Sequence, residues 1–261
     1  MQIFIPSSNR PKKQTTFDNL PPELQRRTML VIPMEQFAAY ERYPCILTPP
    51  SIRGIGATRQ WICDEYGGRI LMLDDDLVFA TRRVDEPTKF RDSTPSEILA
   101  LVENIGLTLD VGYHHGAVAA REGANYCVDP FTYNTRCLRA LFYNADILRA
   151  FKIKFTDMEV MEDFHVSLSL LERGFPSVVH NYMVQNQNGS DLPGGCSVYR
   201  TQEIQARSAA RLKELHPNFV KIVSRTTKTA WGGTTRMDVK VYWKKAYNSS
   251  ARNPAAPGRL G

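Results

Sequence analysis

The sequence has little of what marks a secreted or membrane protein. Its five cysteines are odd in number and form no C-x-x-C pair, so neither a disulfide framework nor a zinc cluster is expected. No apolar run approaches the roughly 18 residues that a membrane span needs. The first residues, Met1 to Pro6, lack the basic start and long apolar core of a signal peptide. These absences favour a soluble intracellular protein with reduced thiols.

Charge is distributed unevenly along the 261 residues. The net charge is +6, from 33 Lys and Arg against 27 Asp and Glu. Residues 205–245 contain ten basic side chains and two acidic ones, an excess of eight, so the rest of the chain is slightly acidic. Such a basic carboxyl-terminal lobe can neutralise nucleic-acid phosphates. From charge alone, a solvated helix face is an equal alternative.

Three consecutive aspartates, Asp74, Asp75 and Asp76, directly follow the apolar run 70–73. Two like charges about 4 Å apart repel by roughly 1 kcal/mol in water and about 4 kcal/mol at an effective dielectric near 20. A divalent cation relieves this repulsion, and hard cations take oxygen ligands that they often share with a substrate phosphate. The alternative is a strand that ends in an acidic turn, because Asp favours turns.

Apolar runs alternate with a helical pattern over the first eighty residues. Strands are predicted at 3–5, 28–32, 45–48 and 70–73, and a helix at 57–66. This alternation predicts βαβ units and a mostly parallel sheet, in which ligands bind beyond the carboxyl ends of the strands. Residues 6–10 follow the first strand as the aspartates follow the fourth. Both segments could therefore face one ligand.

The rest of the chain reads as a continuation of one α/β domain. Further helices are predicted at 96–106, 164–173 and 201–216, and further strands at 131–134, 178–179 and 237–243. A single domain is expected over 1–247, with a donor half of about 1–110 and an acceptor half of about 111–247. Residues 186–195 are predicted to form a long polar loop, and 248–261 a disordered tail.

Two more motifs carry possible chemistry. Gly54 and Gly56 open the helix that contains Arg59, so backbone N–H groups there could face a phosphate. Glu162 and Asp163 stand at the start of another helix. A carboxylate in that position can act as a helix-dipole partner, worth roughly 0.3 to 1 kcal/mol. It can equally act as a general base at the rim of a site.

In this order the motifs resemble GT-A-fold glycosyltransferases, family 2 in particular, with Thr58-Arg59-Gln60 at the place of an Ala-Arg-Asn sequence. The chain resembles the TET-associated glycosyltransferases of bacteriophages more closely. The segments that carry this resemblance are 3–7 with Arg10, 54–61, 71–77, 162–164, 194–197, 199–201, 216–217 and 219–220. The segment Gly-Gly-Cys-Ser-x-Tyr-Arg at 194–200 is the more specific part.

The resemblance implies a GT-A-like (Rossmann-like) α/β fold. Its central sheet would be mixed but mostly parallel, flanked by helices, with a basic carboxyl-terminal extension. It also implies a metal-dependent transfer of sugar from a nucleotide sugar, with a UDP-sugar as the expected donor. The acceptor would be the hydroxymethyl group of a 5-hydroxymethylcytosine or another 5-hydroxymethylpyrimidine in phage DNA. The reaction would take place in the cytoplasm of the infected bacterial host.

On this resemblance, donor and metal ligands can be assigned. The residues expected to bind the donor are Pro6, Ser7, Arg10, Glu35, Arg59, Asp74 and Asp75. Among these, Pro6 and Ser7 would line the nucleoside pocket, and Asp75 would reach the ribose or the sugar. The side chains expected to bind Mn²⁺ or Mg²⁺ are Asp74, Asp76 and His180.

The resemblance also assigns the catalytic and acceptor residues. Asp163 would be the general base, with Glu162 beside it, and a single base implies inversion of configuration. The residues expected to contact DNA are Arg200, Arg207, Lys213 and Lys221. Tyr133, Tyr199 or Trp231 could stack on the base that leaves the duplex, with core packing as the alternative for each. The loop from Asn186 to Cys196 could close over the donor.

Three other functions remain open at this point. A nucleotidyltransferase could use the same aspartates on a nucleoside triphosphate and release pyrophosphate. A two-metal nuclease would cut DNA with Mg²⁺ and need no nucleotide sugar. A non-catalytic DNA-binding module would bind DNA but leave UDP unbound.

Overall fold

The computed structural model describes residues 1–187, 200–226 and 235–250. A ten-stranded sheet runs through it in the order β3-β2-β1-β4-β9-β7-β10-β5-β6, with β8 paired to β10. Its strands are β1 (Gln2–Pro6), β2 (Thr28–Pro33), β3 (Cys45–Thr48), β4 (Arg69–Leu73), β5 (Leu77–Arg82), β6 (Phe90–Asp92), β7 (His115–Ala120), β8 (Phe131–Tyr133), β9 (Ala140–Asn144) and β10 (Ser177–Gln187). A separate hairpin consists of β11 (Val220–Thr226) and β12 (Thr235–Val241).

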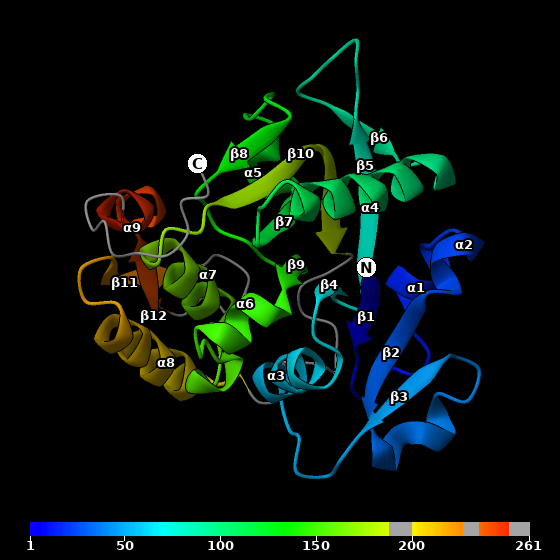
Figure 1. Cartoon of the computed structure of the whole chain (residues 1–261), viewed down its shortest axis with the longest axis horizontal. Coiled ribbons are helices and arrows are strands. Elements are labelled where there is room, and N and C mark those ends of the chain that lie inside the picture. Colours follow the sequence, from blue (N-terminus) through cyan, green and yellow to red (C-terminus); the bar gives the residue numbers. More distant parts are fainter. Residues whose placement is uncertain (188–199, 227–234, 251–261) are drawn as a thin grey trace.

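Helices cover both faces of this sheet (Figure 1). They are α1 (Thr15–Asn19), α2 (Pro22–Gln25), α3 (Ile55–Tyr66), α4 (Pro95–Asp110), α5 (Arg121–Ala124), α6 (Ala145–Ala150), α7 (Glu162–Glu172), α8 (Gln202–Leu215) and α9 (Trp243–Ser250), with 3₁₀ turns η1 (Met34–Ala39) and η2 (Phe155–Asp157). Residues of α2 and α4 share one apolar core, and residues of α3, α6 and α7 share the other.

The strands divide their side chains between these two cores with a period of two. Ile3 and Ile5 of β1 lie in the core under α4, whereas Phe4 lies in the core under α3. In β4, Leu71 and Leu73 face the first core and Met72 the second. This alternation follows from the pleat, in which successive side chains point to opposite faces. The sheet is therefore buried on both faces, as in a three-layer α/β protein.

The predicted fold class is confirmed. Strands β3, β2, β1 and β4 are parallel to one another, as the alternating pattern of the first eighty residues predicts. Strand β9 is antiparallel to both β4 and β7, and β5 is antiparallel to β10. The sheet is thus mixed, with most strands running in one direction.

Strand β7 was not predicted, because its residues are small and have low β propensity. Its sequence, His-Gly-Ala-Val-Ala-Ala, shows no alternation of apolar and polar residues. Packing against larger neighbours fixes it instead. A Cβ added to Gly116 would lie 2.1 Å from the Val178 carbonyl oxygen and 2.2 Å from the Phe142 ring. Only a residue without a side chain fits there.

A smaller lobe with its own core packs beside α7. Helices α8 and α9 and the β11–β12 hairpin gather at one end of the molecule, opposite α1, α2 and β3 (Figure 1). Residues 248–250 belong to α9, so the predicted tail begins too early, and 251–261 lie outside the described residues. The division into donor and acceptor halves stays a prediction. None of the described helices is both long and apolar enough to cross a membrane.

Candidate active site

The three aspartates lie where the chain leaves the middle of the sheet. Strand β4 ends at Leu73 between β1 and β9, and the chain then crosses to β5, which lies between β10 and β6. The Thr16 hydroxyl fixes this crossing, because it donates to the Asp74 carbonyl oxygen (2.5 Å) and accepts from the Leu77 N–H (2.8 Å). The acidic loop is therefore held at a switch point of the sheet, where α/β proteins bind ligands.

Residues after β1 contact two of the aspartates directly. The Ser7 hydroxyl donates to Asp75 Oδ2 over 2.6 Å. Arg10 Nη1 donates to Asp75 Oδ1 (2.8 Å) and to Asp76 Oδ2 (2.9 Å). The ends of β1 and β4 thus meet, as the sequence predicts. Asp75 is buried against Ser7 and Arg10, and its predicted contact with the ribose or the sugar stays a prediction.

Arg59 joins the third aspartate to the start of α7. Its Nη2 donates to Asp74 Oδ1 over 3.0 Å, and its Nη1 donates to Glu162 Oε1 over 2.5 Å. Burial alone would lower the pKa of Arg59, but Glu162, Asp74 and Asp163 raise it above its usual range, so the guanidinium stays charged. The buried guanidinium of Arg59 therefore links Asp74, after β4, to Glu162, at the start of α7.

Asp74 is the most accessible of the three aspartates. Its side chain is 27% exposed, whereas those of Asp75 and Asp76 are buried. Desolvation, with the charges of Asp76 and Asp75, raises the pKa of Asp74 to about 7 in spite of Arg59. The site therefore holds more negative charge than Arg10 and Arg59 neutralise.

The chemistry of this donor set fits a hard cation. No three His, Cys, Asp or Glu side chains within 1–187, 200–226 and 235–250 are grouped so as to hold a metal ion by themselves. Mg²⁺, however, usually binds through one or two carboxylates together with substrate phosphates and waters. Asp74 and Asp76 can supply such carboxylates, and a diphosphate could complete the ligand set.

His180 does not belong to this group, so the structure does not bring this predicted metal ligand together with the aspartates. Its Nε2 lies 3.1 Å from Thr108 Oγ1, and its Nδ1 lies 3.0 Å from the Tyr182 hydroxyl, within the core under α4. Strand β10 continues to Gln187, whose amide donates to Asp76 over 3.0 Å. His180 precedes Gln187 by seven positions, with a register shift between His180 and Val184, and its ring contacts Thr108 and Tyr182 instead of the aspartates.

Asp163 lies beside Glu162 at the first turn of α7. The residue before the helix, Met161, has φ 66° and ψ 27°, a left-handed conformation that is costly for a residue with a side chain. This turn directs Glu162 inward to Arg59, while Asp163 remains half-exposed. Burial raises the pKa of Glu162, with Arg59 opposing that shift. Of the two carboxylates, Asp163 is the one that a substrate can reach.

Gly56 packs against the backbone near η2, whereas the sequence predicts that it faces a phosphate. It lies inside α3, where an added Cβ would meet the carbonyl oxygens of Phe155 at 3.2 Å and Met158 at 3.3 Å. The glycine therefore allows α3 to approach η2 closely. This approach places Arg59, one turn further along α3, next to Glu162. Gly54 precedes the helix with φ 82°.

The remaining predicted donor residues lie near the same edge of the sheet. Pro6 is the buried last residue of β1. Glu35 is exposed on η1, and its neighbour Gln36 accepts a hydrogen bond from the Asn9 N–H over 2.7 Å. Sequence reasoning missed three polar side chains, Gln14, Thr16 and Gln187, which contact Ser7 or the aspartate loop. Isolated Gln and Thr residues carry no local signal for such a role.

The four predicted DNA contacts lie on different elements or next to them, and they stay predictions. The Arg200 guanidinium donates two hydrogen bonds to Gln205 Oε1, and its positive charge opposes the rise in the pKa of Glu162. Arg207 and Lys213 lie on α8, where Arg207 pairs with Glu159 over 2.6 Å. Lys221 is exposed on β11, opposite Lys240 of β12.

Among the aromatic candidates, Tyr133 is exposed and stacks on Tyr113. Tyr199 and Trp231 lie outside the described ranges, as does the segment Gly194 to Cys196 with most of the proposed donor-covering loop.

One family model and two phage proteins resemble this chain. The model of the TET-Associated Glycosyltransferase family matches residues 1–193, which include the aspartate loop, Arg59 and the start of α7. A beta-glucosyl-HMC-alpha-glucosyl-transferase of Enterobacteria phage T2 is 25% identical over 235 residues, covering 83% of this chain and 81% of the relative. The protein of the same description from phage T6 is 25% identical over 236 residues, with the same coverage.

Two solved structures show a weaker likeness. A CMP:2-keto-3-deoxy-manno-octonic acid synthetase complexed with CTP has a TM-score of 0.39 and 13% identity, covering 68% of this chain and 88% of that chain. A structure described as a glucose-1-phosphate thymidylyltransferase from Bacillus anthracis has a TM-score of 0.41 and 11% identity, covering 84% and 96%. Neither likeness bears on function at these scores.

Proposed function

Because the chain belongs to the TET-associated glycosyltransferase family, we propose that it transfers a sugar from a nucleotide sugar to the hydroxymethyl group of a 5-hydroxymethylpyrimidine in DNA. The observation that carries this proposal is Arg59, which binds Asp74 on one side and Glu162 on the other. A donor held at the aspartates would then lie next to an exposed carboxylate, Asp163.

The donor half of the site suits a nucleoside diphosphate sugar, and we propose that the donor is a UDP-sugar. Asp74 and Asp76 would hold Mn²⁺ or Mg²⁺, which when bound neutralises charge on the leaving diphosphate. Arg10 and Arg59 add two guanidinium groups at the same place, and such groups bind phosphate through paired N–H donors. Ser7 positions Asp75, which keeps Arg10 at the site.

Asp163 is the general base of the proposed reaction. It takes the proton of the acceptor hydroxymethyl group while that oxygen forms a bond to the anomeric carbon, and the bond from this carbon to the diphosphate oxygen breaks. Glu162 is already engaged by Arg59, so it positions the arginine and does not take the proton. A single displacement with one base inverts the anomeric configuration.

The acceptor base must leave the duplex to reach this carboxylate. Enzymes that modify a base extrude it from the stack at a cost of a few kcal/mol, or they act on single strands. The names of the two phage relatives refer to a glucosylated hydroxymethylated cytosine and to an alpha-glucosyl transfer. Both a hydroxymethylated base and one that already carries glucose are therefore acceptors to test.

The experiment uses the full chain with either acceptor DNA, Mn²⁺ and a panel of nucleotide sugars. The DNA is then digested, and its nucleosides are weighed and examined by NMR. A mass gain of one sugar residue supports the proposed function, and unchanged nucleosides with every donor contradict it. A β-linked sugar from an α-linked donor supports the role of Asp163, whereas an α-linked product contradicts single displacement.

A further inference from the structure

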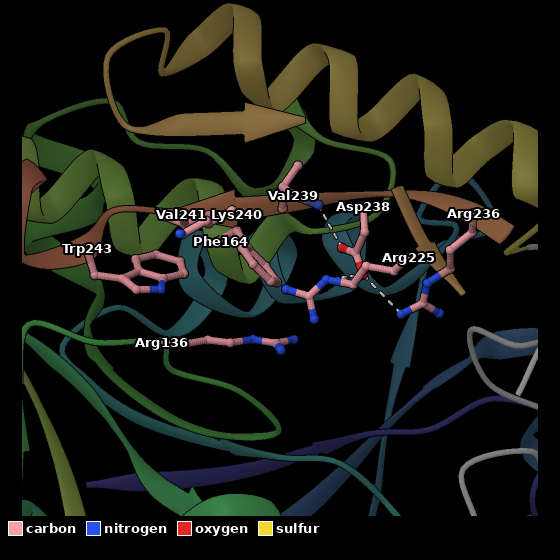
Figure 2. A pocket seen from close by; sticks show the side chains of 9 residues that line it. All are labelled: Arg136, Phe164, Arg225, Arg236, Asp238, Val239, Lys240, Val241 and Trp243. Atoms are coloured by element: carbon pink, nitrogen blue, oxygen red, sulfur yellow. Dashed lines mark hydrogen bonds and ion pairs between the residues drawn. The ribbon is translucent and has the colours of Figure 1, made fainter. Parts of the chain in front are cut away.

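A basic pocket lies between the β11–β12 hairpin and the start of α7 (Figure 2). Its volume is about 280 Å³, close to the lower end of the range for pockets that bind small organic groups. The residues that line this basic pocket are Arg136, Phe164, Arg225, Arg236, Asp238, Val239, Lys240, Val241 and Trp243. All but Arg136 and Phe164 lie beyond residue 193, where the match to the family ends.

The pocket carries a strong excess of positive charge. Its lining includes four basic side chains and one acidic one, an excess of three. Arg225 lies directly opposite Arg236 in the antiparallel register, and the pair Lys221 and Lys240 repeats this pattern. Like charges directly opposite each other destabilise a sheet. Basic side chains clustered on one face are the electrostatic footprint of nucleic-acid binding.

Asp238 relieves only part of this repulsion. Its Oδ2 lies 3.1 Å from Arg236 Nη2 and 3.7 Å from Arg225 Nε, so one carboxylate serves two guanidinium groups (Figure 2). The opposite face of the hairpin is apolar, and its buried residues Val220 and Val239 belong to the core shared with α8. The charged face is therefore turned away from α8 and toward Phe164 and Arg136.

Two aromatic rings form another wall of the pocket. The rings of Phe164 and Trp243 are 5.5 Å apart and inclined by 41°, and the Arg136 guanidinium lies 4.4 Å from the centre of the Phe164 ring. Both aromatic residues are half-buried, so part of each remains open to a ligand. Cationic grooves with aromatic side chains are how proteins bind single-stranded nucleic acid, with phosphates on the cations and bases on the rings.

The position of the pocket links it to the proposed reaction. Phe164 directly follows Asp163 in α7, and successive residues of a helix point about 100° apart. With Phe164 facing the pocket, Asp163 faces the neighbouring space. A strand that places one nucleotide in the pocket therefore brings an adjacent nucleotide toward Asp163.

We propose that the basic pocket binds an unpaired nucleotide of the acceptor DNA strand, next to the base that is modified. Phosphates of the strand contact Arg225, Arg236 and Lys240, and the base of this nucleotide stacks on Trp243. The identity of the strand as acceptor rests on the proposed function; the binding of single-stranded DNA does not.

The test compares two double variants of the full chain. Arg225→Ala/Lys240→Ala removes two cations of the pocket. Arg26→Ala/Arg27→Ala removes two exposed arginines next to α2, at the opposite end of the molecule (Figure 1). The probe is a fluorescent single-stranded oligonucleotide with hydroxymethylated bases, titrated with protein at several salt concentrations. Unfolding free energies and the rate of donor hydrolysis without DNA are measured on the same samples.

The pocket variant is expected to raise the Kd for the oligonucleotide about tenfold or more and to reduce the slope of log K against log salt by about 1.4, as for two lost phosphate contacts on a single strand. Its free energy of unfolding should not fall, because the substitutions remove a like-charge repulsion. Its donor hydrolysis should match that of wild type, because the contacts of Arg225 and Lys240 lie within the hairpin and at Tyr242. The control should leave Kd and slope unchanged. Wild-type Kd and slope in the pocket variant, or an equal loss in the control, would overturn the proposal.

Two measurements distinguish a failure of the proposed DNA-binding pocket from a failure of the proposed function. If wild type transfers no sugar to any acceptor, the proposed function fails, while the oligonucleotide titration still decides the pocket. If wild type transfers sugar, the pocket variant should raise the KM for DNA and leave the KM for the donor unchanged. A raised donor KM with an unchanged DNA KM would place Arg225 and Lys240 at the donor site and overturn the inference.

Discussion

Arg59 and Glu162 form a buried ion pair, with 2.5 Å between Nη1 and Oε1, although 103 positions separate them in the sequence. The same arginine also binds Asp74. Removal of one partner of a buried pair leaves the other charge uncompensated, which costs about 3 to 5 kcal/mol. We therefore expect Arg59→Met to lower the free energy of unfolding by about that amount in a denaturant titration.

The double variant Arg59→Met/Glu162→Met should recover much of this stability, because an apolar pair of similar volume can replace a buried ion pair. Arg211 pairs with Glu214 on the exposed surface of α8 and serves as a control, so Arg211→Met should change stability little. A small loss in Arg59→Met, equal to that of the control, would show that the pair at α3 and α7 does not hold the site together.

Asp163→Asn should lower the rate of sugar transfer by about 10² to 10⁴, because an amide cannot take the acceptor proton. Donor binding should stay at its wild-type value, and the free energy of unfolding should fall by no more than about 1 kcal/mol, since Asp163 is half-exposed and interacts with the helix dipole. Glu159→Gln, an exposed substitution four positions earlier, is the matched control. Wild-type rates in Asp163→Asn would remove its role as base.

Mn²⁺ and UDP should stabilise the protein more together than the sum of their separate effects. The reason is that Asp74 and Asp76 provide two carboxylates and the diphosphate provides the remaining ligands. Thermal unfolding with Mn²⁺, with UDP and with both measures this directly. Asp76→Asn should abolish the joint effect and a chelator should reverse it in wild type. A joint effect that survives Asp76→Asn would place the cation elsewhere.

Two glycines offer a paired test of packing. Gly116→Ala forces a Cβ into the Val178 carbonyl and the Phe142 ring, so it should cost about 1 to 3 kcal/mol or more. Gly106 lies within α4 with nothing within 4 Å of an added Cβ, so Gly106→Ala should stabilise by about 0.4 to 1 kcal/mol. Denaturant titrations of both variants give the comparison. Similar effects of the two substitutions would contradict the close contact at β7.

Three buried histidines should make the protein sensitive to acid. Burial lowers the pKa of His115 to about 3 and those of His165 and His180 to about 4. Below about pH 6.5 the unfolded chain takes up protons that the folded protein does not, so stability falls as the pH drops from about 6.5 to 4.

Each such group contributes a slope of up to about 1.4 kcal/mol per pH unit in this window. His180→Gln should flatten the dependence of the unfolding free energy on pH by about that amount, whatever its effect at pH 7. An unaltered slope would mean that His180 is protonated in the folded protein.

Much of the site could be predicted because it rests on strand ends. Asp75, Ser7 and Arg10 meet because β1 and β4 are neighbouring parallel strands, and the apolar runs before them indicate both strands. The link from Arg59 to Glu162 could not be predicted from spacing, because it depends on how closely Gly56 lets α3 approach η2. The position of His180 apart from the aspartates could not be predicted, because polar residues conceal the extension of β10 to Gln187.

The carboxyl-terminal hairpin shows a different limit. Ten basic residues between 205 and 245 are compatible with a polyanionic partner, and two of the predicted DNA contacts, Arg207 and Lys213, lie on α8. Arg207 and Lys213 lie on a helix that packs against the apolar face of the hairpin, and Arg207 is paired with Glu159. The register of β11 and β12 decides which basic side chains line the pocket. The amino-acid composition does not predict that register.

The most direct test of a single sugar-transfer site uses two DNA molecules of the same sequence, one with hydroxymethylated pyrimidines and one without. Each is incubated with the protein, Mn²⁺ and a labelled nucleotide sugar, and the label retained by the DNA is measured. We predict label on the hydroxymethylated DNA alone, lost in Asp163→Asn. Intact hydroxymethylated DNA without label, cleaved DNA, or equal labelling of both molecules would contradict the account.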